Sequence, residues 1–195
     1  MGGYDWLSPC KAPGDMVICA DGGIRHAEAL GLIPDLVVGD FDSYGYRDFP
    51  CETQVFQSEK DDTDMLIAIK AGLAAGYRSF ALYGGLGGRL DHTVANLQHL
   101  LYLSDHNAQG CLLDAKNEAF IIDKSRMIPR KKGYKLSFFS ADTACCGVSL
   151  RGVKYPLAEA TLTNAFPLGV SNEFAGDRCE VSLRSGRLLC ILSKD

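Results

Sequence analysis

The chain has 195 residues, of which 47% are hydrophobic and 23% are charged, and this composition excludes a disordered chain. Its net charge of −4 argues against a general nucleic-acid binder, which carries a basic surface. Its apolar runs are far shorter than the roughly 20 residues that cross a bilayer, so no membrane segment is expected.

The spacing and surroundings of the eight cysteines indicate free thiols, which are typical of a reducing compartment. None of them forms a C-x-x-C pair, so zinc ribbons and thioredoxin chemistry are not expected. Four of them lie inside strand-like apolar runs, where free thiols usually act as small buried hydrophobes. The start of the sequence also lacks the charged and apolar regions of a signal peptide. We therefore expect a cytoplasmic protein.

The first two thirds of the chain alternate between strand-like and helix-like segments. Strands are predicted at 16–20, 36–38, 54–57, 79–83 and 110–114. Helices are predicted at 24–30, 63–75 and 91–103, the second of them with Thr63 as its N-cap. This alternation predicts an α/β catalytic domain over residues 1–123, with a mainly parallel sheet flanked by helices.

After residue 123 the pattern changes to short strands. The basic stretch at 124–132 is interpreted as a solvated linker, with nucleic-acid contact as the alternative. Further strands are predicted at 134–140, 146–150, 180–183 and 187–192, the last two flanking a hairpin turn. These strands predict an all-β sandwich as a C-terminal domain over residues 133–195.

Acidic residues are concentrated in the first third of the chain. Residues 1–64 contain 13 acidic and 4 basic side chains, whereas residues 65–195 contain 11 and 16. Several of these acids follow predicted strands or precede a helix: Asp21, Asp40, Asp42, Asp61, Asp62 and Asp64. Ligands bind beyond the carboxyl ends of parallel strands, so these carboxylates are expected to converge on one crevice. Such a cluster needs a cation, and oxygen ligands without His or Cys favour Mg²⁺. Separate solvated turns are the alternative.

A glycine-rich loop, GGLGG at 84–88, follows a predicted strand and opens a helix. Free backbone amides at a helix start suit a phosphate, and Arg89 can add a guanidinium fork. The loop is neither a Walker A loop nor a dinucleotide fingerprint, so a tight connecting turn stays open as the alternative. Asp91 is interpreted as a helix N-cap, a metal ligand or a base near a substrate hydroxyl. The residues alone therefore predict a Mg²⁺-dependent enzyme that handles a phosphorylated ligand.

Six runs of the sequence resemble the thiamine pyrophosphokinase family. In the first half these are ICADGGIRHAEALG at 18–31, PDLVVGDFDS at 34–43, KDDTD at 60–64 and GGLGGRLDH at 84–92. In the second half, the runs that resemble the second domain of bacterial members are GVKYPL at 152–157 and GVSNEF at 169–174. The resemblance implies transfer of the pyrophosphoryl group of ATP to the hydroxyl of thiamine, which gives thiamine diphosphate and AMP. It also implies a homodimer whose active sites lie between the catalytic domain of one subunit and the sandwich of the other.

The matched positions imply roles for individual residues. The metal is assigned to Asp40, Asp42 and Asp64, and the catalytic set is Asp42, Asp64, Arg89 and Asp91. Substrate contacts are assigned to Asp21, Asp61, Thr63, Asn96, Ser171, Asn172 and Phe174. Phe174 takes the place of an aromatic that stacks on thiamine in related enzymes, and a place in the sandwich core is its alternative.

Two rival hypotheses use the same residues. A Mg²⁺-dependent phosphotransferase or hydrolase for another alcohol would need the N-terminal motifs but not the motif at 169–174. A non-catalytic thiamine sensor is disfavoured because every acidic motif is retained. Family members usually begin with a further strand and a glycine turn, where this sequence starts with Met1-Gly2-Gly3. The loss of that strand is expected to leave an unpaired sheet position.

Overall fold

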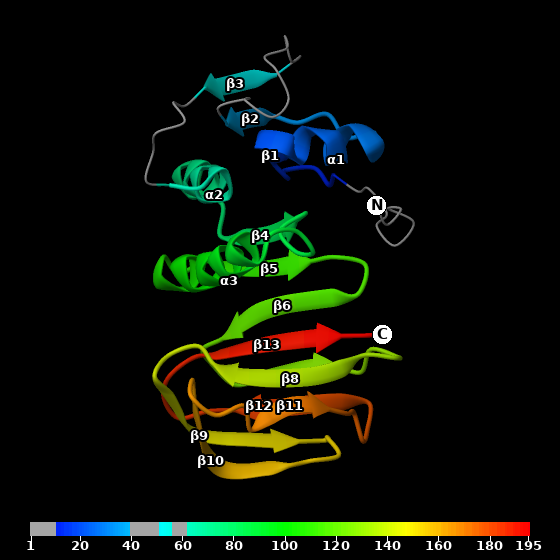
Figure 1. Ribbon diagram of the computed structural model, residues 1–195, viewed down its shortest axis with the longest axis vertical. Coiled ribbons are helices and arrows are strands. Elements are labelled where there is room, and N and C mark those ends of the chain that lie inside the picture. Colours follow the sequence, from blue (N-terminus) through cyan, green and yellow to red (C-terminus); the bar gives the residue numbers. More distant parts are fainter. Residues whose placement is uncertain (1–10, 40–50, 56–61) are drawn as a thin grey trace. The chain divides into compact units, whose positions relative to one another are not determined.

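The computed structural model describes residues 11–39, 51–55 and 62–195 (Figure 1). The chain divides into two compact units, Met1–Phe80 and Ala81–Asp195, and the division falls within strand β4 (Ser79–Tyr83). It does not coincide with the domain boundary that the sequence predicts at residue 123. The reason is that β4 belongs to a sheet that continues into the strands of the predicted sandwich.

The first unit is built on a parallel sheet of three strands. Their order is β1 (Ile18–Ala20), β2 (Leu36–Gly39) and β3 (Glu52–Val55). A 3-10 turn, η1 (Asp21–Gly23), and helix α1 (Ile24–Ala29) follow β1 directly. The chain thus leaves the carboxyl end of β1 through an acidic, glycine-rich turn.

Strand β2 is the centre of the first unit, and all of its residues are buried. Val37 packs in one cluster with Ile24 of α1, and Val38 packs in another with Ile67 of α2 (Asp64–Ala74). Because successive strand residues point to opposite faces, α1 and α2 cover the two faces of the sheet. The α/β arrangement predicted here is confirmed for these three strands, and the continuous apolar run of β2 is typical of it.

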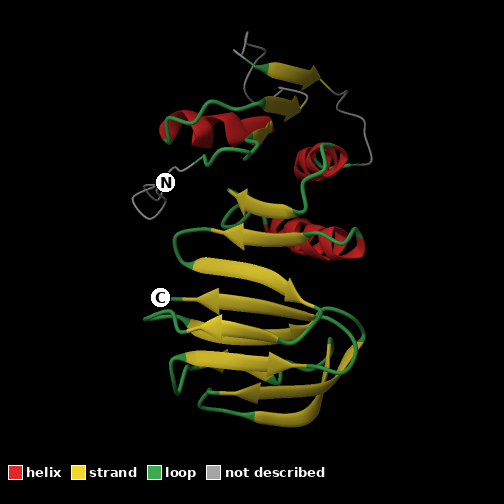
Figure 2. Ribbon diagram, turned by 180° about the vertical axis from the view of Figure 1, so that it is seen from behind, coloured by secondary structure: helices red, strands yellow, loops and turns green. Residues whose placement is uncertain are grey.

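The second unit contains helix α3 (Leu90–Asp105) and two sheets (Figure 2). Beyond β4, its strands are β5 (Gln109–Leu113), β6 (Asn117–Ile122), β7 (Arg126–Pro129), β8 (Lys135–Ser140), β9 (Ala144–Arg151), β10 (Leu157–Thr163), β11 (Gly169–Asn172), β12 (Arg178–Ser182) and β13 (Leu188–Ser193). A six-stranded sheet has the order β11-β8-β13-β6-β5-β4, and a four-stranded sheet has the order β10-β9-β12-β7. Phe138 and Leu188 of the first sheet share one core with Val148 and Val181 of the second. These two sheets are therefore packed as a sandwich.

The mainly parallel sheet predicted for residues 1–123 is found only in part. Parallel pairing joins β1, β2 and β3, whereas β5 and β6 pair antiparallel. In the turn between β5 and β6, Oδ1 of Asp114 accepts hydrogen bonds from the backbone N–H groups of Lys116 and Asn117, at 2.7 and 2.6 Å. Such a tight turn reverses the chain at once and cannot supply the crossover that a parallel pair needs.

The stretch at 124–132, interpreted as a linker, contains a strand. β7 pairs antiparallel with β12 along the edge of the four-stranded sheet. Ile128 is the one buried residue of β7, so the strand has no alternating apolar pattern to read. Strands β6, β10 and β11 were likewise not expected. None of the helices that the structure describes is long and apolar enough to cross a membrane.

Candidate functional site

Asp21 lies where β1 ends, the place that the sequence predicts for a site acid. A Cβ on Gly39, at the end of β2, would lie 3.1 Å from the Cα of Asp21, so a larger residue there would crowd the turn that carries Asp21. Oδ1 of Asp21 is buried and has no hydrogen-bond partner within residues 11–39, 51–55 and 62–195. A buried carboxylate oxygen without a partner is costly, and a cation would satisfy it.

The start of α2 holds the next predicted residues. Thr63 is the N-cap, as expected, and its Oγ1 accepts a hydrogen bond from the backbone N–H of Leu66 at 3.2 Å. Asp64 is half-buried in the first helical turn, where the helix dipole favours a carboxylate. Asp62 forms an ion pair with Lys70, with 2.5 Å between Oδ2 and Nζ. Asp62 is thus engaged by the helix it precedes.

Three predicted site residues, Asp40, Asp42 and Asp61, lie outside the described residues. Of the predicted metal set, only Asp64 is described. Among the residues that the structure describes, no three His, Cys, Asp or Glu side chains form a group that could hold a metal ion. The metal site therefore stays a prediction.

The glycine-rich loop at 84–88 is packed against α3 and β5. The Nδ2 of Asn96, a buried side chain of α3, donates to the carbonyl oxygen of Gly85 at 2.9 Å. A Cβ on Gly85 would lie 2.7 Å from Cδ2 of Leu112 and 3.1 Å from Nδ2 of Asn96. Asn96, which the resemblance assigns to the substrate, thus ties the loop to the helix that the loop opens.

Arg89 and Asp91 form a bidentate pair at the start of α3. Nε of Arg89 donates to Oδ1 of Asp91 at 3.1 Å, and Nη2 donates to Oδ2 at 2.5 Å. The backbone N–H of His92 donates to the same Oδ1 at 2.9 Å. The N-cap of α3 is Arg89, so Asp91 lies in the first turn and is not the N-cap.

The pair sets the charge states of both side chains. Hydrogen bonding from Arg89 is the main cause that lowers the pKa of Asp91 to about 2, and the same bonds raise the pKa of Arg89. The two side chains are 75% and 62% exposed. At neutral pH the start of α3 therefore presents a guanidinium and a carboxylate that an entering ligand can reach.

Two motifs of the second half, 152–157 and 169–174, lie side by side. The backbone N–H of Lys154 donates to the carbonyl oxygen of Glu173 at 2.9 Å, and that of Ala175 donates to Gly152 at 2.9 Å. Val153 and Phe174 face one another in an antiparallel bridge between these donors. The segment before β10 thus pairs with the segment that leaves β11.

Asn172 joins these motifs through its side chain and is only 3% exposed. Its Oδ1 accepts from the backbone N–H groups of Tyr155 and Glu173, both at 3.0 Å, and its Nδ2 donates to the carbonyl oxygen of Tyr155 at 2.8 Å. We call these three hydrogen bonds the Asn172 clasp. The clasp fixes the backbone of Tyr155 at both its N–H and its C=O.

The neighbours of Asn172 differ in exposure. Ser171 is exposed and left-handed, with φ 57°, and its N–H donates to Oγ of Ser137 at 3.1 Å. Phe174 is half-buried and packs against the sandwich core, which was the alternative to a substrate-stacking role. Tyr155, which was not predicted as a site residue, is 59% exposed. The signal that could have found it is its place in the motif GVKYPL.

The start of α3 and the Asn172 clasp belong to opposite edges of the six-stranded sheet. β4, which leads to Arg89, is one edge strand, and β11, which carries Ser171 and Asn172, is the other. Five strand spacings correspond to about 24 Å. A single chain therefore does not bring these two groups of predicted residues together.

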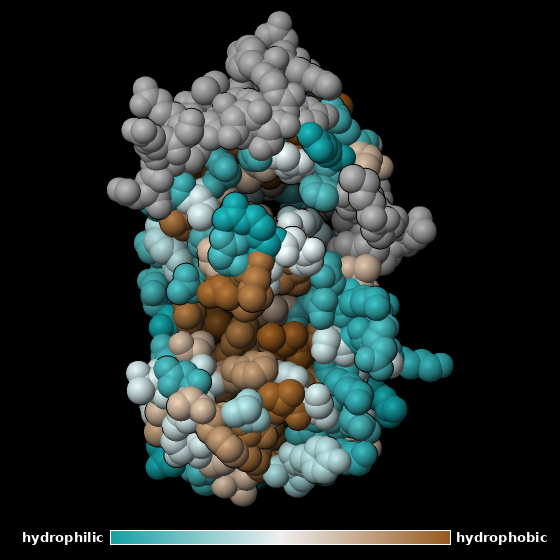
Figure 3. Space-filling view, in the orientation of Figure 1, coloured by the Kyte–Doolittle hydropathy of each residue, from teal (hydrophilic) through white to brown (hydrophobic). Residues whose placement is uncertain are grey.

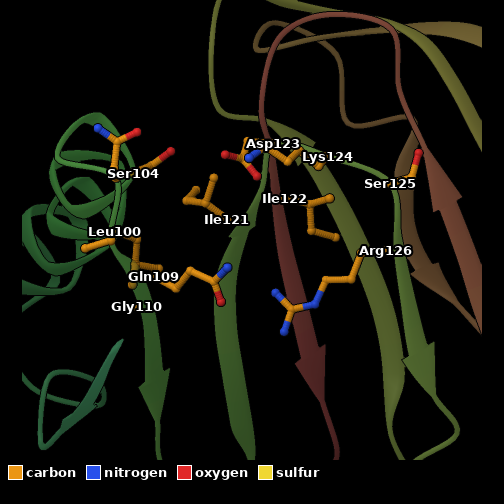
Figure 4. Close-up of a pocket in the computed structure, with 12 residues that line it drawn as sticks. Leu100, Ser104, Gln109, Gly110, Ile121, Ile122, Asp123, Lys124, Ser125 and Arg126 are labelled. Atoms are coloured by element: carbon orange, nitrogen blue, oxygen red, sulfur yellow. The ribbon is translucent and has the colours of Figure 1, made fainter. Parts of the chain in front are cut away.

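A separate hollow of about 460 Å³ lies at the opposite end of α3 from Arg89. Figure 4 shows the side chains of Gln109 and Arg126 directed toward each other from either side of β6. Leu100, Ser104 and Ile121 also line this hollow, but none of the predicted site residues does. The candidate chemistry is thus on the open surface at the start of α3.

Together, these features define a class of protein: a helix-covered parallel sheet followed by an antiparallel sandwich, with a glycine-rich loop and an arginine–aspartate pair at a helix start. Two family models match the chain. The model described as "Thiamin pyrophosphokinase, catalytic domain" matches residues 11–112, and "Thiamin pyrophosphokinase, vitamin B1 binding domain" matches residues 124–188.

Individual relatives agree with the family models. The chain is 30% identical over 173 residues to the thiamine pyrophosphokinase of Bacillus subtilis, covering 85% of this chain and 81% of that protein. The crystal structure of the Bacillus subtilis enzyme aligns with a TM-score of 0.86 at 27% identity, over 95% of this chain and 90% of that chain. The Geobacillus thermodenitrificans structure aligns with a TM-score of 0.83 at 26% identity, over 95% and 89%. The chain belongs to the thiamine pyrophosphokinase family.

Proposed function

We propose that this chain transfers the pyrophosphoryl group of ATP to the hydroxyl of thiamine, which gives thiamine diphosphate and AMP. The observation that carries the proposal is that both family models match, in order, along one chain. A phosphotransferase for another alcohol would have no need of a vitamin B1-binding domain. The exposed Arg89–Asp91 pair lies in the part matched by the catalytic-domain model. The exposed Ser171 lies in the part matched by the vitamin B1-binding model.

In the proposed reaction the thiamine hydroxyl oxygen forms a bond to the β-phosphorus of ATP. The bond from that phosphorus to the oxygen bridging to the α-phosphorus breaks, and AMP leaves with this oxygen. Arg89 would neutralise charge that develops on the transferred group, and the amides of the loop at 84–88 would orient it. Such a transfer depends on positioning and charge more than on a covalent protein intermediate.

Asp91 would orient the thiamine hydroxyl, and it is a weak base as long as Arg89 is bonded to it. With a pKa of about 2, set mainly by hydrogen bonding from Arg89, its carboxylate has little affinity for a proton at neutral pH. If Arg89 moves to a phosphate, that cause of the low pKa is removed and Asp91 becomes a better acceptor. Binding of the nucleotide would in this way prepare Asp91 for the hydroxyl proton.

The cofactor of the proposed reaction is Mg²⁺, held by Asp40, Asp42 and Asp64 with Asp21 beside them. The buried oxygen of Asp21, with no described partner, fits a nearby cation, and so does an all-carboxylate donor set. When bound, Mg²⁺ would neutralise phosphate oxygens of ATP. The carboxylates would hold the cation in the crevice beyond β1 and β2.

The proposed assembly is a homodimer with shared active sites. Within one chain, Arg89 and the Asn172 clasp follow opposite edge strands, about 24 Å apart, whereas one thiamine must reach both. A second copy can supply the missing half.

The outer face of the six-stranded sheet offers a surface for that second copy. Ile121, Phe139, Leu189 and Ile191 are aligned on this face by the register of β6, β13 and β8, and all are half-buried. Figure 3 shows apolar side chains gathered on this side of the second unit. On α3, Leu90 and Val94 are 78% and 50% exposed beside Asp91. Contiguous apolar surface of this kind is typical of a protein–protein interface.

A cytoplasmic location is proposed as well. All seven cysteines that the structure describes are free thiols, as expected for a reducing compartment. Burial raises the pKa of Cys19 and Cys111 to about 11, which keeps them protonated and unreactive.

The decisive experiment incubates the protein with ATP, Mg²⁺ and thiamine and identifies the products. Thiamine diphosphate with AMP is expected, and omission of Mg²⁺ should stop the reaction. ADP with thiamine monophosphate would overturn the proposed reaction. Thiamine binding without turnover would favour a sensor.

Mixed dimers test the shared site. Asp91→Asn subunits should be inactive alone, and Asn172→Ala subunits should be only weakly active at low thiamine concentration. Random mixing should recover about a quarter of wild-type activity above that residual level, because half of the dimers then keep one intact site. No recovery in verified mixed dimers would show that each site lies within one chain.

A further inference from the structure

The hollow of about 460 Å³ at the end of α3 has walls that the fold holds firmly. A Cβ on Gly110, which lines it, would lie 2.5 Å from Cδ1 of Leu103 and 3.0 Å from Cδ2 of Leu100, so α3 and β5 are in close contact there. Nη1 of Arg187 also donates to Oδ1 of Asp105, the last residue of α3, at 2.6 Å. The hollow is therefore formed before any ligand arrives, and its volume suits a small molecule.

The side chain of Arg126 lines this hollow and is held by an aromatic ring. Its guanidinium carbon, Cζ, lies 4.3 Å from the centroid of the Phe120 ring, and such stacking fixes the plane of the guanidinium while its N–H edge stays open to a ligand. Glu118, two residues before Phe120 on the same face of β6, pairs with Lys131 instead. Among the residues that the structure describes, no carboxylate pairs with Arg126. The guanidinium is therefore available to an anion.

Arg126 lies on the sandwich side of β6. The ring on which it stacks, Phe120, belongs to the sandwich core, whereas the next residue, Ile121, points to the outer face proposed for the second copy. Gln109 shares a face of β5 with Cys111, which packs against the same core. Figure 4 shows the Gln109 side chain directed toward Arg126. A ligand held between Gln109 and Arg126 would thus leave the outer face free.

Most of the other lining side chains are polar. Hydroxyl and amide groups come from Ser104, Asn107 and Ser125, and charged groups come from Asp123 and Lys124 in the turn that leaves β6. Among the described lining residues, Asp123 is the one carboxylate, and Lys124 offsets its charge. Arg126 then gives the hollow a net positive charge. Hydroxyl and amide side chains bond to the hydroxyl groups of a ligand, and a guanidinium bonds best to a phosphate or carboxylate.

We propose that this hollow is a second ligand site, for a small phosphate ester that carries hydroxyl groups, as a sugar phosphate does. The phosphate accepts two parallel hydrogen bonds from Arg126, and Lys124 adds a second positive charge. Gln109 and Ser125 bond to hydroxyl groups of the ligand. The described lining residues include none of those assigned to ATP, Mg²⁺ or thiamine, so the site is separate from the proposed reaction.

Calorimetric titration of the full chain tests the site with ribose 5-phosphate and its two fragments, inorganic phosphate and ribose. Ribose 5-phosphate should bind with a Kd below about 1 mM, and at least about tenfold more tightly than either fragment. The reason is that the ester alone meets Arg126 and the hydroxyl and amide side chains together.

Single variants place the bound ester in the hollow. Arg126→Gln should weaken the binding of ribose 5-phosphate at least about tenfold, because a bidentate charge-assisted pair is lost. Arg178→Gln is the matched control, since Arg178 belongs to the same sandwich and already pairs with Glu180, at 2.9 Å between Nη2 and Oε1. It should bind the ester like the wild type. Arg89→Gln should also bind it normally, because Arg89 does not line the hollow. Melting curves confirm that each variant is folded.

Three results would overturn the inference. The first is that the wild type does not bind ribose 5-phosphate. The second is that the ester binds no better than inorganic phosphate, which would mean that the lining does not recognise its hydroxyl groups. The third is that binding survives in Arg126→Gln and is lost in Arg89→Gln, which would place the ester at the start of α3. None of these results bears on the proposed function, which the separate assay with ATP and thiamine decides.

Discussion

The start of α3 and the Asn172 clasp hold their polar side chains in opposite ways. Arg89 and Asp91 are mostly exposed, and each is the other's main partner. Asn172 is 3% exposed and makes three hydrogen bonds to backbone groups. Charged groups that must exchange one partner for a phosphate stay on the surface, where the exchange is inexpensive. A group that fixes the shape of a binding surface is buried, where its loss is not compensated by water.

The largest effect is expected for the acidic residues that follow β1 and β2. Asp42→Asn should lower kcat at least about 100-fold, because a lost carboxylate weakens both the metal and the charge stabilisation that depends on it. The melting temperature should not change. Asp62→Asn is the matched control, since Asp62 already pairs with Lys70, and it should stay close to wild-type activity. Near-normal turnover of Asp42→Asn at saturating Mg²⁺ would remove Asp42 from the site.

The buried clasp should matter more to stability than the exposed Arg89–Asp91 pair. Asn172→Ala is expected to lower the free energy of unfolding by about 1–3 kcal/mol, because backbone groups of Tyr155 and Glu173 lose their partner. Asp91→Asn should shift the urea midpoint much less, since its side chain is 62% exposed. Chemical denaturation of the two variants measures the difference. Equal midpoints would mean that water replaces Asn172 without cost.

The packing of the glycine-rich loop at 84–88 can be tested at two of its glycines. Gly85→Ala should destabilise the protein by about 1–3 kcal/mol, because the added Cβ meets Leu112 and Asn96. The contact distances would be 2.7 and 3.1 Å. At Gly88, a Cβ would meet nothing within 4 Å, so Gly88→Ala is the matched control. Comparable melting temperatures for the two variants would contradict the packing described for the loop.

The ion pair at the start of α3 predicts that the pKa of Asp91 depends on Arg89. Hydrogen bonding from Arg89 lowers the pKa of Asp91 from 3.8 to about 2. Because the folded-state pKa is the lower one, the pair favours folding above pH 3.8, and this contribution is lost as the pH falls through about 2. In Arg89→Gln the pKa of Asp91 should rise toward its ordinary value, which carboxyl carbon NMR measures directly. An unchanged pKa would show that the pair does not persist in solution.

The smallest effect is expected at Lys154, beside the clasp. Lys154→Gln removes a positive charge close to the Ser171–Asn172 pair and leaves Glu173 without its ion-pair partner, so the Kd for the cationic thiamine should fall about two- to threefold. Lys194→Gln is a suitable control, because Lys194 lies against a different residue, 5.3 Å from the ring centroid of Tyr134. Weaker thiamine binding by Lys154→Gln would mean that Lys154 assists the substrate instead of competing with it.

Local signals in the sequence determined much of the first unit. Thr63 was predicted as an N-cap because its hydroxyl can accept from the first helical turn, and Leu66 donates to it. The apolar run around Val37 and Val38 predicted a strand covered on both faces, and α1 and α2 cover it. The order of the motifs along the chain likewise identifies the family without any geometry. Such signals lie within a few residues of one another, where periodicity and capping act.

Only the tertiary structure decided which distant segments meet. Ile128 is the one buried residue of β7, so no alternating apolar pattern marks this strand in the sequence. The segment is a strand because it pairs with β12. Asn172 reads as a substrate ligand in its motif, yet its amide is taken up by Tyr155, 17 positions earlier in the sequence. The opposite placement of β4 and β11 in one sheet follows from the pairing of every strand between them. These arrangements arise from hydrogen bonds between segments far apart along the chain, and no local pattern encodes them.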